Sequence, residues 1–280
     1  MTLLLRLTAL AVALSIACRG TAEPGRRGAQ PRVVSLHDVP TEMMVALGAT
    51  ARLVGVGDPV DLATDARAAI AGVPRVGGLE SILAVRPTVV LGMATIAERD
   101  PELVSALRGA GIDVYLPGPA VLDDVYTIVQ QVARRADVVA AGESLVAATK
   151  GRIGSAVPAR SPLRVFVYDC CDPPFTAGGQ TVLSDLIRHA GGKNVFADQA
   201  TDWTHVSWEE VVARRPELVV VDSYTYDGQG DTDDKVKALR AIPTLEKVPV
   251  AVMPLGCALG GLRSVEGLGR LERAIREARP

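Results

Sequence analysis

The residues best suited to chemistry in this chain are its cysteines and histidines. The 280-residue sequence holds four cysteines and three histidines, and Cys170 and Cys171 are adjacent in the stretch DCCDPPFTAGG. Thiolates and imidazoles bind soft or borderline metals such as zinc and copper, whereas two oxidised thiols form a disulfide. These side chains could therefore hold a metal, tie loops together or act as nucleophiles.

Three of the cysteines and one histidine follow apolar runs that are typical of buried strands. His37 follows RVVSL, the pair Cys170 and Cys171 follows RVFVY, and Cys257 comes soon after VAVM. In open sheets of parallel strands, ligands bind beyond the carboxyl ends of the strands. We therefore expect all four residues on the side of a ligand cleft.

These four residues leave three interpretations. In the first, Cys170 or Cys171 forms a disulfide with Cys257 and leaves one thiol over. In the second, the three thiolates and His37 hold a thiophilic metal, either directly or as part of a bound complex. The third is nucleophilic catalysis by a cysteine with His37 or His205, but no hydrolase signature such as G-x-S-x-G is present. A disulfide and a ligand role for the remaining thiol could coexist.

The N-terminus predicts export. Residues 1–18 contain one arginine and then an apolar run that ends at Ala17-Cys18, which resembles the lipobox of bacterial lipoproteins and makes Cys18 the expected lipidation site. Residues 19–31 are polar, with glycine and proline, and are expected to be a flexible tether to the membrane. The formal net charge is −2, so the chain offers no basic surface for nucleic acid.

The elements that must position these residues occur in a repeat. ESILAVRPTVVLG (80–92) and EEVVARRPELVVVD (209–222) both place a short helix before Arg-Pro and then a β-branched run. Proline ends the helix, and a strand that is apolar at every position suits a parallel sheet covered on both faces. A second pair, RVVSL and RVFVY, each leads into a loop and a helix that is followed by glycine. The repeat predicts two α/β lobes of related plan.

We place the N-terminal lobe at 32–119, a helical connector at 120–161 and the C-terminal lobe at 162–280. Apolar residues recur at helical spacing in 122–135 and again in 136–157. The second segment, about 21 residues, would reach ~30 Å as a helix and could run along both lobes as a rigid backbone. The predicted fold is thus two Rossmann-like lobes with parallel sheets, joined by a long backbone helix, with a ligand cleft between them.

Four stretches resemble one known family in the order in which they occur here. They are RVVSLHDVPTEMMVALGATARLVGVG, LESILAVRPTVVLG, PPFTAGGQTVLSDLIRHAGGKNVF and VSWEEVVARRPELVVV. They look like the periplasmic iron-chelate and cobalamin-binding proteins, the solute-binding components of ABC importers that have a helical backbone between the lobes. The resemblance covers nearly all of residues 32–280 and implies a protein that binds its ligand without transforming it.

The resemblance also implies roles for particular residues. Glu80 and Glu209 match the pair of glutamates, one in each lobe, that dock on permease arginines. Phe175, Trp203 and Arg263 match ligand-facing positions of the cobalamin binders, where flat rings and a guanidinium suit a large ring with amide or anionic edges. Two other aromatic positions of those binders are not matched here, because Pro59 and Met93 stand where a tyrosine and a tryptophan are expected.

Together these features predict an exported solute-binding protein, lipid-anchored or periplasmic, that is not an enzyme and has no intrinsic cofactor. Its expected ligand is metal-containing: a ferric siderophore, haem or a corrinoid. Its expected partners are an ABC permease and its ATPase, and the membrane through the N-terminal lipid. The alternatives are direct capture of a thiophilic metal ion by Cys170, Cys171, Cys257 and His37, and a cysteine-dependent enzyme on the same scaffold.

Overall fold

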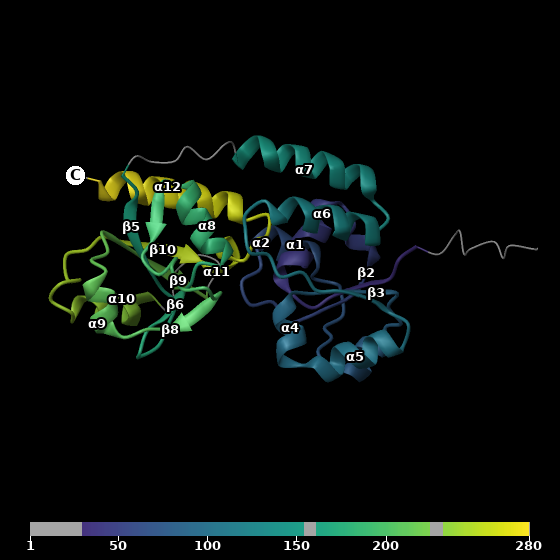
Figure 1. The fold of residues 1–280 in the computed structure, drawn as a ribbon. Helices are drawn as coiled ribbons and strands as arrows, with labels where there is room; N and C mark the ends of the chain where they lie inside the picture. The colour runs from purple at the N-terminus through teal and green to yellow at the C-terminus, as the bar shows by residue number, and fades with distance from the viewer. Residues whose placement is uncertain (1–29, 154–160, 225–231, 280) are drawn as a thin grey trace, which may run out of the picture.

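The computed structural model describes residues 30–153, 161–224 and 232–279. They form two α/β lobes that lie side by side, as predicted (Figure 1). The predicted signal peptide, Cys18 and the predicted tether up to residue 29 lie outside the described residues. No helix in the described residues is long and apolar enough to cross a bilayer.

The N-terminal lobe is built on a parallel sheet of order β2-β1-β3-β4. Its strands are short, and β1 and β3 are buried at every position, as expected of strands covered on both faces. The strand bounds are β1 Val33–Ser35, β2 Leu53–Val56, β3 Val89–Leu91 and β4 Asp113–Tyr115. The helices of the lobe are α1 Asp38–Ala46, α2 Thr64–Ala69, α3 Leu79–Ala84, α4 Ala94–Arg99 and α5 Pro101–Gly109.

The C-terminal lobe repeats this plan with a parallel sheet of order β10-β9-β5-β7. Numbered within its own lobe, each sheet has the order 2-1-3-4, which confirms the predicted repeat. The strands are β5 Leu163–Tyr168, β7 Gly192–Asn194, β9 Leu218–Ser223 and β10 Val250–Pro254, with a separate antiparallel pair of β6 Phe175–Ala177 and β8 Trp203–His205. The helices are α8 Val182–His189, α9 Trp208–Ala213, α10 Thr232–Arg240, α11 Leu255–Ala258 and α12 Ser264–Ala278.

The repeat extends to individual hydrogen bonds. In each lobe an arginine at the start of the first strand, Arg32 or Arg164, donates from its guanidinium to the carbonyl of the residue before the repeated proline. Those residues, Arg86 and Arg215, have φ of 46° and 49°. The left-handed residue turns the chain from helix to strand, and the arginine satisfies a carbonyl that the ended helix leaves without a partner.

The connector contains two helices, one in each of the two segments with helical spacing. Helix α6 spans Asp124–Arg135, and the described part of α7 spans Val139–Ile153. Residues 154–160 lie outside the described residues. Helices α6, α7 and α12 lie on one side of the molecule, above both sheets (Figure 1).

One hydrophobic core continues through both lobes. Its buried residues include Met43 and Leu91 of the N-terminal lobe, Ile128 of the connector, and Leu183 and Ile275 of the C-terminal lobe. Because the apolar faces of α1, α6, α8 and α12 share this cluster, separating the lobes would expose apolar surface to water. The lobes are therefore packed as one body.

Candidate ligand-binding cleft

A cavity of about 320 Å³ lies between the lobes. The N-terminal lobe contributes Met93, then Ala94, Thr95 and Glu98 of α4, and residues 117–119, and the connector contributes Ala120. The C-terminal lobe contributes residues 180–182 at the start of α8, then Asp202 and Trp203, and residues 258–259. A second hollow adjoins it and shares Ala120, Gln180 and Asp202. The volume is in the range of pockets that hold small organic ligands.

Trp203 belongs to an aromatic wall on the β6–β8 pair. Its ring stacks on Phe175 with centroids 5.7 Å apart, and Phe175 contacts the ring of His205 at 4.9 Å. The register pairs Phe175 with His205 and Ala177 with Trp203, which places these side chains on one face. The structure therefore brings together two predicted ligand residues, Phe175 and Trp203, and Trp203 lines the cavity.

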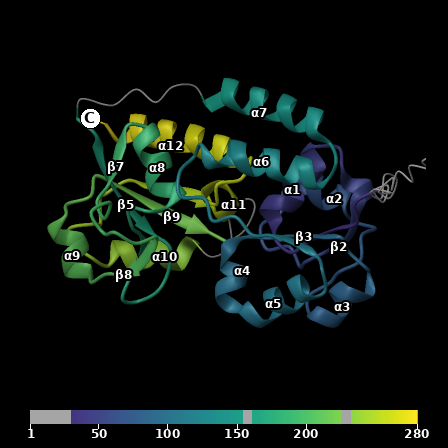
Figure 2. The same cartoon turned by 45° about the vertical axis from the view of Figure 1, so that its right-hand side comes forward.

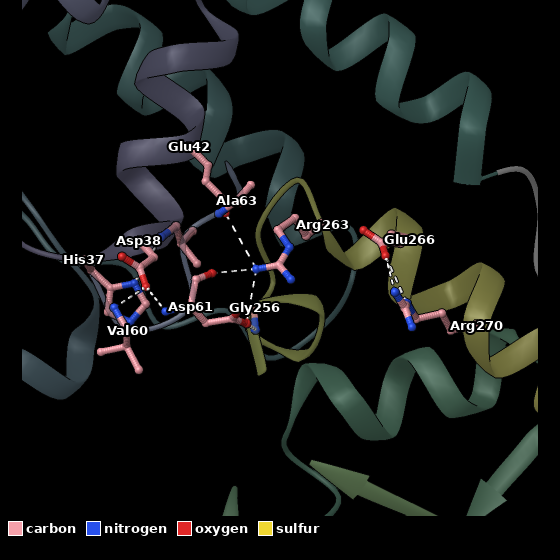
Figure 3. Close-up of polar contacts among 11 residues, drawn as sticks. His37, Asp38, Glu42, Val60, Asp61, Ala63, Gly256, Arg263, Glu266 and Arg270 are labelled. Carbon is pink, nitrogen blue, oxygen red and sulfur yellow. Dashed lines mark hydrogen bonds and ion pairs between the residues drawn. The ribbon is translucent and has the colours of Figure 1, made fainter. Parts of the chain in front are cut away.

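Arg263 is not part of this wall. It precedes α12 and is 9% exposed, and its guanidinium Nη1 lies 3.1 Å from Oδ2 of Asp61 and 3.7 Å from Oε1 of Glu42 in the other lobe (Figure 3). The same nitrogen donates to the backbone oxygen of Asp61 at 2.6 Å. Two carboxylates of the opposite lobe enclose the charge of Arg263 in this structure, and its role at the ligand stays a prediction.

Helix α1 holds the loop that carries Asp61. Oδ2 of Asp38 accepts the backbone N–H groups of Val60 and Asp61, and Oε1 of Glu42 accepts that of Ala63 (Figure 3). Asp38 and Glu42 are four residues apart and so lie on one face of the helix. Asp61 in turn accepts the N–H of Gly256, at the start of α11, at 2.5 Å. We call Glu42, Asp61, Gly256 and Arg263 the interlobe latch.

The charges of the latch do not cancel. One guanidinium faces the carboxyl groups of Asp61, which is 2% exposed, and of Glu42, whose side chain is 10% exposed. Burial raises the pKa of Glu42 to about 7, against the opposing effects of the Ala63 N–H and Arg263. Burial likewise raises the pKa of Asp61. A proton on Glu42 leaves a neutral Arg263–Asp61 pair, which costs less in a buried setting than an excess negative charge.

The cysteines do not pair as expected. Cys170 and Cys171 form a disulfide with each other, and Cys257 is a free, fully buried thiol. The predicted link to Cys257 is therefore wrong, although one thiol is left over. Burial raises the pKa of Cys257 to about 12, so its thiolate, which is the nucleophilic form, is disfavoured.

The predicted metal ligands are also not brought together. The described residues contain no group of three or more His, Cys, Asp or Glu side chains placed to hold a metal. His37 caps α1, because its Nδ1 accepts the N–H of Val39 at 3.2 Å, and burial lowers its pKa. With Cys170 and Cys171 oxidised and Cys257 enclosed, the four residues do not form the predicted site.

The disulfide turn instead contacts the start of α9. The hydroxyl of Tyr168 donates to the carbonyl of Cys171 at 3.1 Å, and the indole N–H of Trp208 donates to Asp172 at 3.2 Å. The rings of Tyr168 and Trp208 pack edge to face with centroids 5.3 Å apart. The turn therefore joins the C-lobe core to the helix that carries Glu209.

Comparison with known proteins agrees with this architecture. A family model described as periplasmic binding protein matches residues 33–252. The chain belongs to the periplasmic binding protein family. Among curated proteins, a vitamin B12-binding protein of Yersinia pestis is 28% identical over 201 residues, which cover 69% of this chain and 70% of that protein.

Solved structures of this family share the two-lobe fold. A periplasmic haem-binding protein from Roseiflexus sp. RS-1 in its apo form is 25% identical, with a TM-score of 0.73 over 89% of this chain and 99% of that one. A periplasmic binding protein from Veillonella parvula has a TM-score of 0.80 at 22% identity, over 90% and 93% of the two chains. The predicted family and fold are both confirmed.

Sequence reasoning missed the acidic residues of the interface. The missed residues are Glu42, Asp61, Glu98 and Asp202. Two of them had a local signal: HDVPTE places Glu42 one helical turn after Asp38, and Asp202 adjoins Trp203. The first spacing is a usable signal for a helix face that binds a loop or a cation. Nothing local identifies Asp61 or Glu98, because their roles depend on the opposite lobe.

Proposed function

We propose that this chain is the extracytoplasmic solute-binding component of an ABC importer and that its ligand is a metal-containing complex. Ferric hydroxamates and other siderophores, haem and corrinoids are the candidates. The observation that carries the proposal is the cavity between two lobes of the family fold, which is lined by Trp203, whose ring stacks on Phe175. The named relatives bind vitamin B12 or haem, and neither name describes an enzyme.

Direct capture of a metal ion and cysteine-dependent catalysis have less support. The first needs open thiolates near His37, and the described residues offer a disulfide and a buried thiol instead. The second needs a reactive thiolate, which burial disfavours at Cys257. Binding and release, without a chemical step, is the mechanism that the cavity supports.

Docking on the permease is proposed to use Glu80 and Glu209. Each is the second residue of its helix, α3 or α9, and both are exposed. Figure 2 shows these helices at opposite ends of the molecule. Two carboxylates that far apart can fix the orientation of the protein on a permease with matching arginines. The permease would then transport the ligand, driven by ATP hydrolysis in its ATPase. We also propose that the protein is exported and that a lipid on Cys18 anchors it to the membrane.

Native mass spectrometry with elemental analysis tests the function directly. The exported chain, purified with and without reductant, is expected to retain an intact organic metal complex, and Trp203→Ala is expected to lose it. Retention of a bare metal ion that depends on Cys170 and Cys171 would contradict the proposal.

Docking is tested separately in proteoliposomes that contain the permease and ATPase. Glu80→Lys combined with Glu209→Lys should abolish ligand-stimulated ATP hydrolysis while leaving ligand affinity unchanged. The control is Glu143→Lys with Glu272→Lys, which changes two exposed carboxylates on α7 and α12 by the same charge. Equal loss in both double variants would argue against a specific docking role.

A further inference from the structure

The charged side chains that line the interlobe cavity are both carboxylates. Glu98 comes from α4 of the N-terminal lobe, and Asp202 precedes β8 of the C-terminal lobe. The adjoining hollow shares Asp202 and brings no further charged side chain. Among the described residues, neither space is lined by a lysine, arginine or histidine. A ligand in this cavity therefore meets negative charge from both lobes.

The buried cations near the lobe boundary are engaged elsewhere. Arg263 contacts Asp61 and Glu42 in the interlobe latch. Lys235, which is 9% exposed, donates to the carbonyl of Asp222 and lies over the ring of Tyr224. Neither residue lines the cavity. Within the described residues, an anionic group on a ligand would therefore find no guanidinium or ammonium in the cavity lining to compensate the cost of its desolvation.

The remaining lining is apolar or uncharged. Trp203 and Met93 offer an aromatic ring and a thioether, and Thr95 and Gln180 offer a hydroxyl and an amide group. Such groups suit the flat or apolar body of a metal complex and the amide or hydroxamate oxygens at its edges. None of them favours a carboxylate over a neutral group.

We propose that this cavity selects metal complexes without net negative charge and discriminates against anionic ones, including haem with its two ionised propionates. The inference rests on the proposed function and narrows its ligand class to neutral or cationic complexes. Discrimination arises because Glu98 and Asp202 repel an anion from the two lobes; both residues are exposed, so salt should weaken the effect.

Matched pairs of complexes isolate this effect of charge. The first pair is ferrioxamine B, whose pendant ammonium makes it cationic, and its N-succinyl derivative, which carries a carboxylate instead. The second is haem dimethyl ester and haem, and the third is cyanocobalamin and a monocarboxylic acid derived from it. Isothermal titration of the mature chain at low salt should give an affinity about three- to tenfold weaker for the anionic member of any pair that binds.

The double variant Glu98→Gln with Asp202→Asn should narrow that ratio to below about twofold. Asparagine keeps the side-chain oxygen with which Asp202 accepts the N–H of Trp203 at 2.7 Å, so the wall itself should stay in place. The control Glu143→Gln with Glu272→Gln removes the same net charge from α7 and α12 and should leave the ratio unchanged.

The outcomes separate the two proposals. If some pair binds and its anionic member binds as tightly as the other or more tightly, charge selection is wrong while the solute-binding function stands. If the ratio changes equally in the control variant, the walls of the cavity are not responsible and the inference fails. If none of the six complexes binds to wild type or to the double variant, the proposed function itself is contradicted.

Discussion

The boundary between the lobes has two unlike ends. At the latch, a guanidinium of one lobe meets two carboxylates of the other, and Gly256 donates across the boundary to Asp61. At the cavity, Glu98 and Asp202 bring the same sign of charge from both lobes. The boundary is thus closed where opposite charges meet and hollow where carboxylates line both walls.

This difference predicts two kinds of mutant. Substitutions at the latch should change the free energy of unfolding, because they disturb a buried cluster that the shared core holds in place. Substitutions of the exposed cavity carboxylates Glu98 and Asp202 should change ligand affinity and leave stability nearly unaffected. The following predictions test that division from the largest expected effect to the smallest.

Arg263→Met should destabilise the protein most, by about 3–5 kcal/mol, because it leaves the buried carboxylate of Asp61 without its cation. Urea unfolding followed by circular dichroism measures this. The matched control is Arg270→Met, which removes a partly exposed ion pair with Glu266 on α12 and should cost less than about 1 kcal/mol (Figure 3). Equal losses in the two variants would mean that the latch has no special role.

Gly256→Ala should cost about 1–3 kcal/mol by overpacking the latch. A Cβ at this position would overlap the guanidinium of Arg263 and lie 3.0 Å from Oδ2 of Asp61. Gly269→Ala on α12 is the contrast, since its Cβ would meet only Arg273, at 3.8 Å, and alanine favours a helix by up to about 1 kcal/mol. Thermal unfolding should show opposite signs for the two substitutions.

Trp203→Ala should weaken binding of the retained complex by about tenfold or more, as loss of a large aromatic contact in a binding site does. The chain's other tryptophan provides the control, because Trp208 packs on Tyr168 and not in the cavity. Trp208→Ala should lower stability with little change in affinity, as measured by titration calorimetry. Equal affinity losses would place the ligand outside the cavity.

Glu42→Gln should change how stability depends on pH. The pKa of Glu42 rises from 4.5 to about 7 on folding, so the folded state binds the proton more tightly. Its stabilising contribution is complete below pH 4.5 and is lost as the pH rises through 7. In Glu42→Gln the free energy of unfolding should therefore fall less between these values, whereas Glu143→Gln should keep the wild-type slope.

The parts of the fold that depend on local sequence were predictable. The β-branched runs at 89–91 and 218–221 lie in the strands β3 and β9, because each follows a proline that ends the preceding helix. The repeated motif predicted a second lobe of the same plan, and the two sheets have the same strand order. Phe175 and Trp203 were singled out through the family resemblance; their rings stack, and Trp203 lines the cavity.

The features that depend on contacts between distant segments were not predictable. Arg263 donates to Asp61, which is 202 residues away in sequence, so no local pattern could show that its charge is engaged. Cys170 and Cys171 pair with each other at a turn where Cys171 has a φ of 77°, whereas Cys257 is a fully buried free thiol. The spacing of the cysteines in the sequence predicts neither the burial of Cys257 nor the turn at Cys171.

Hydrogen–deuterium exchange tests the central comparison most directly. The mature chain would be measured alone and saturated with whichever of ferrioxamine B, haem dimethyl ester and cyanocobalamin native mass spectrometry shows to bind. We predict slower exchange on binding in peptides that cover 93–99 and 200–205, with little change in 60–63 and 256–263. A larger change in the latch peptides than around Trp203 would contradict the division between a closed latch and an open ligand site.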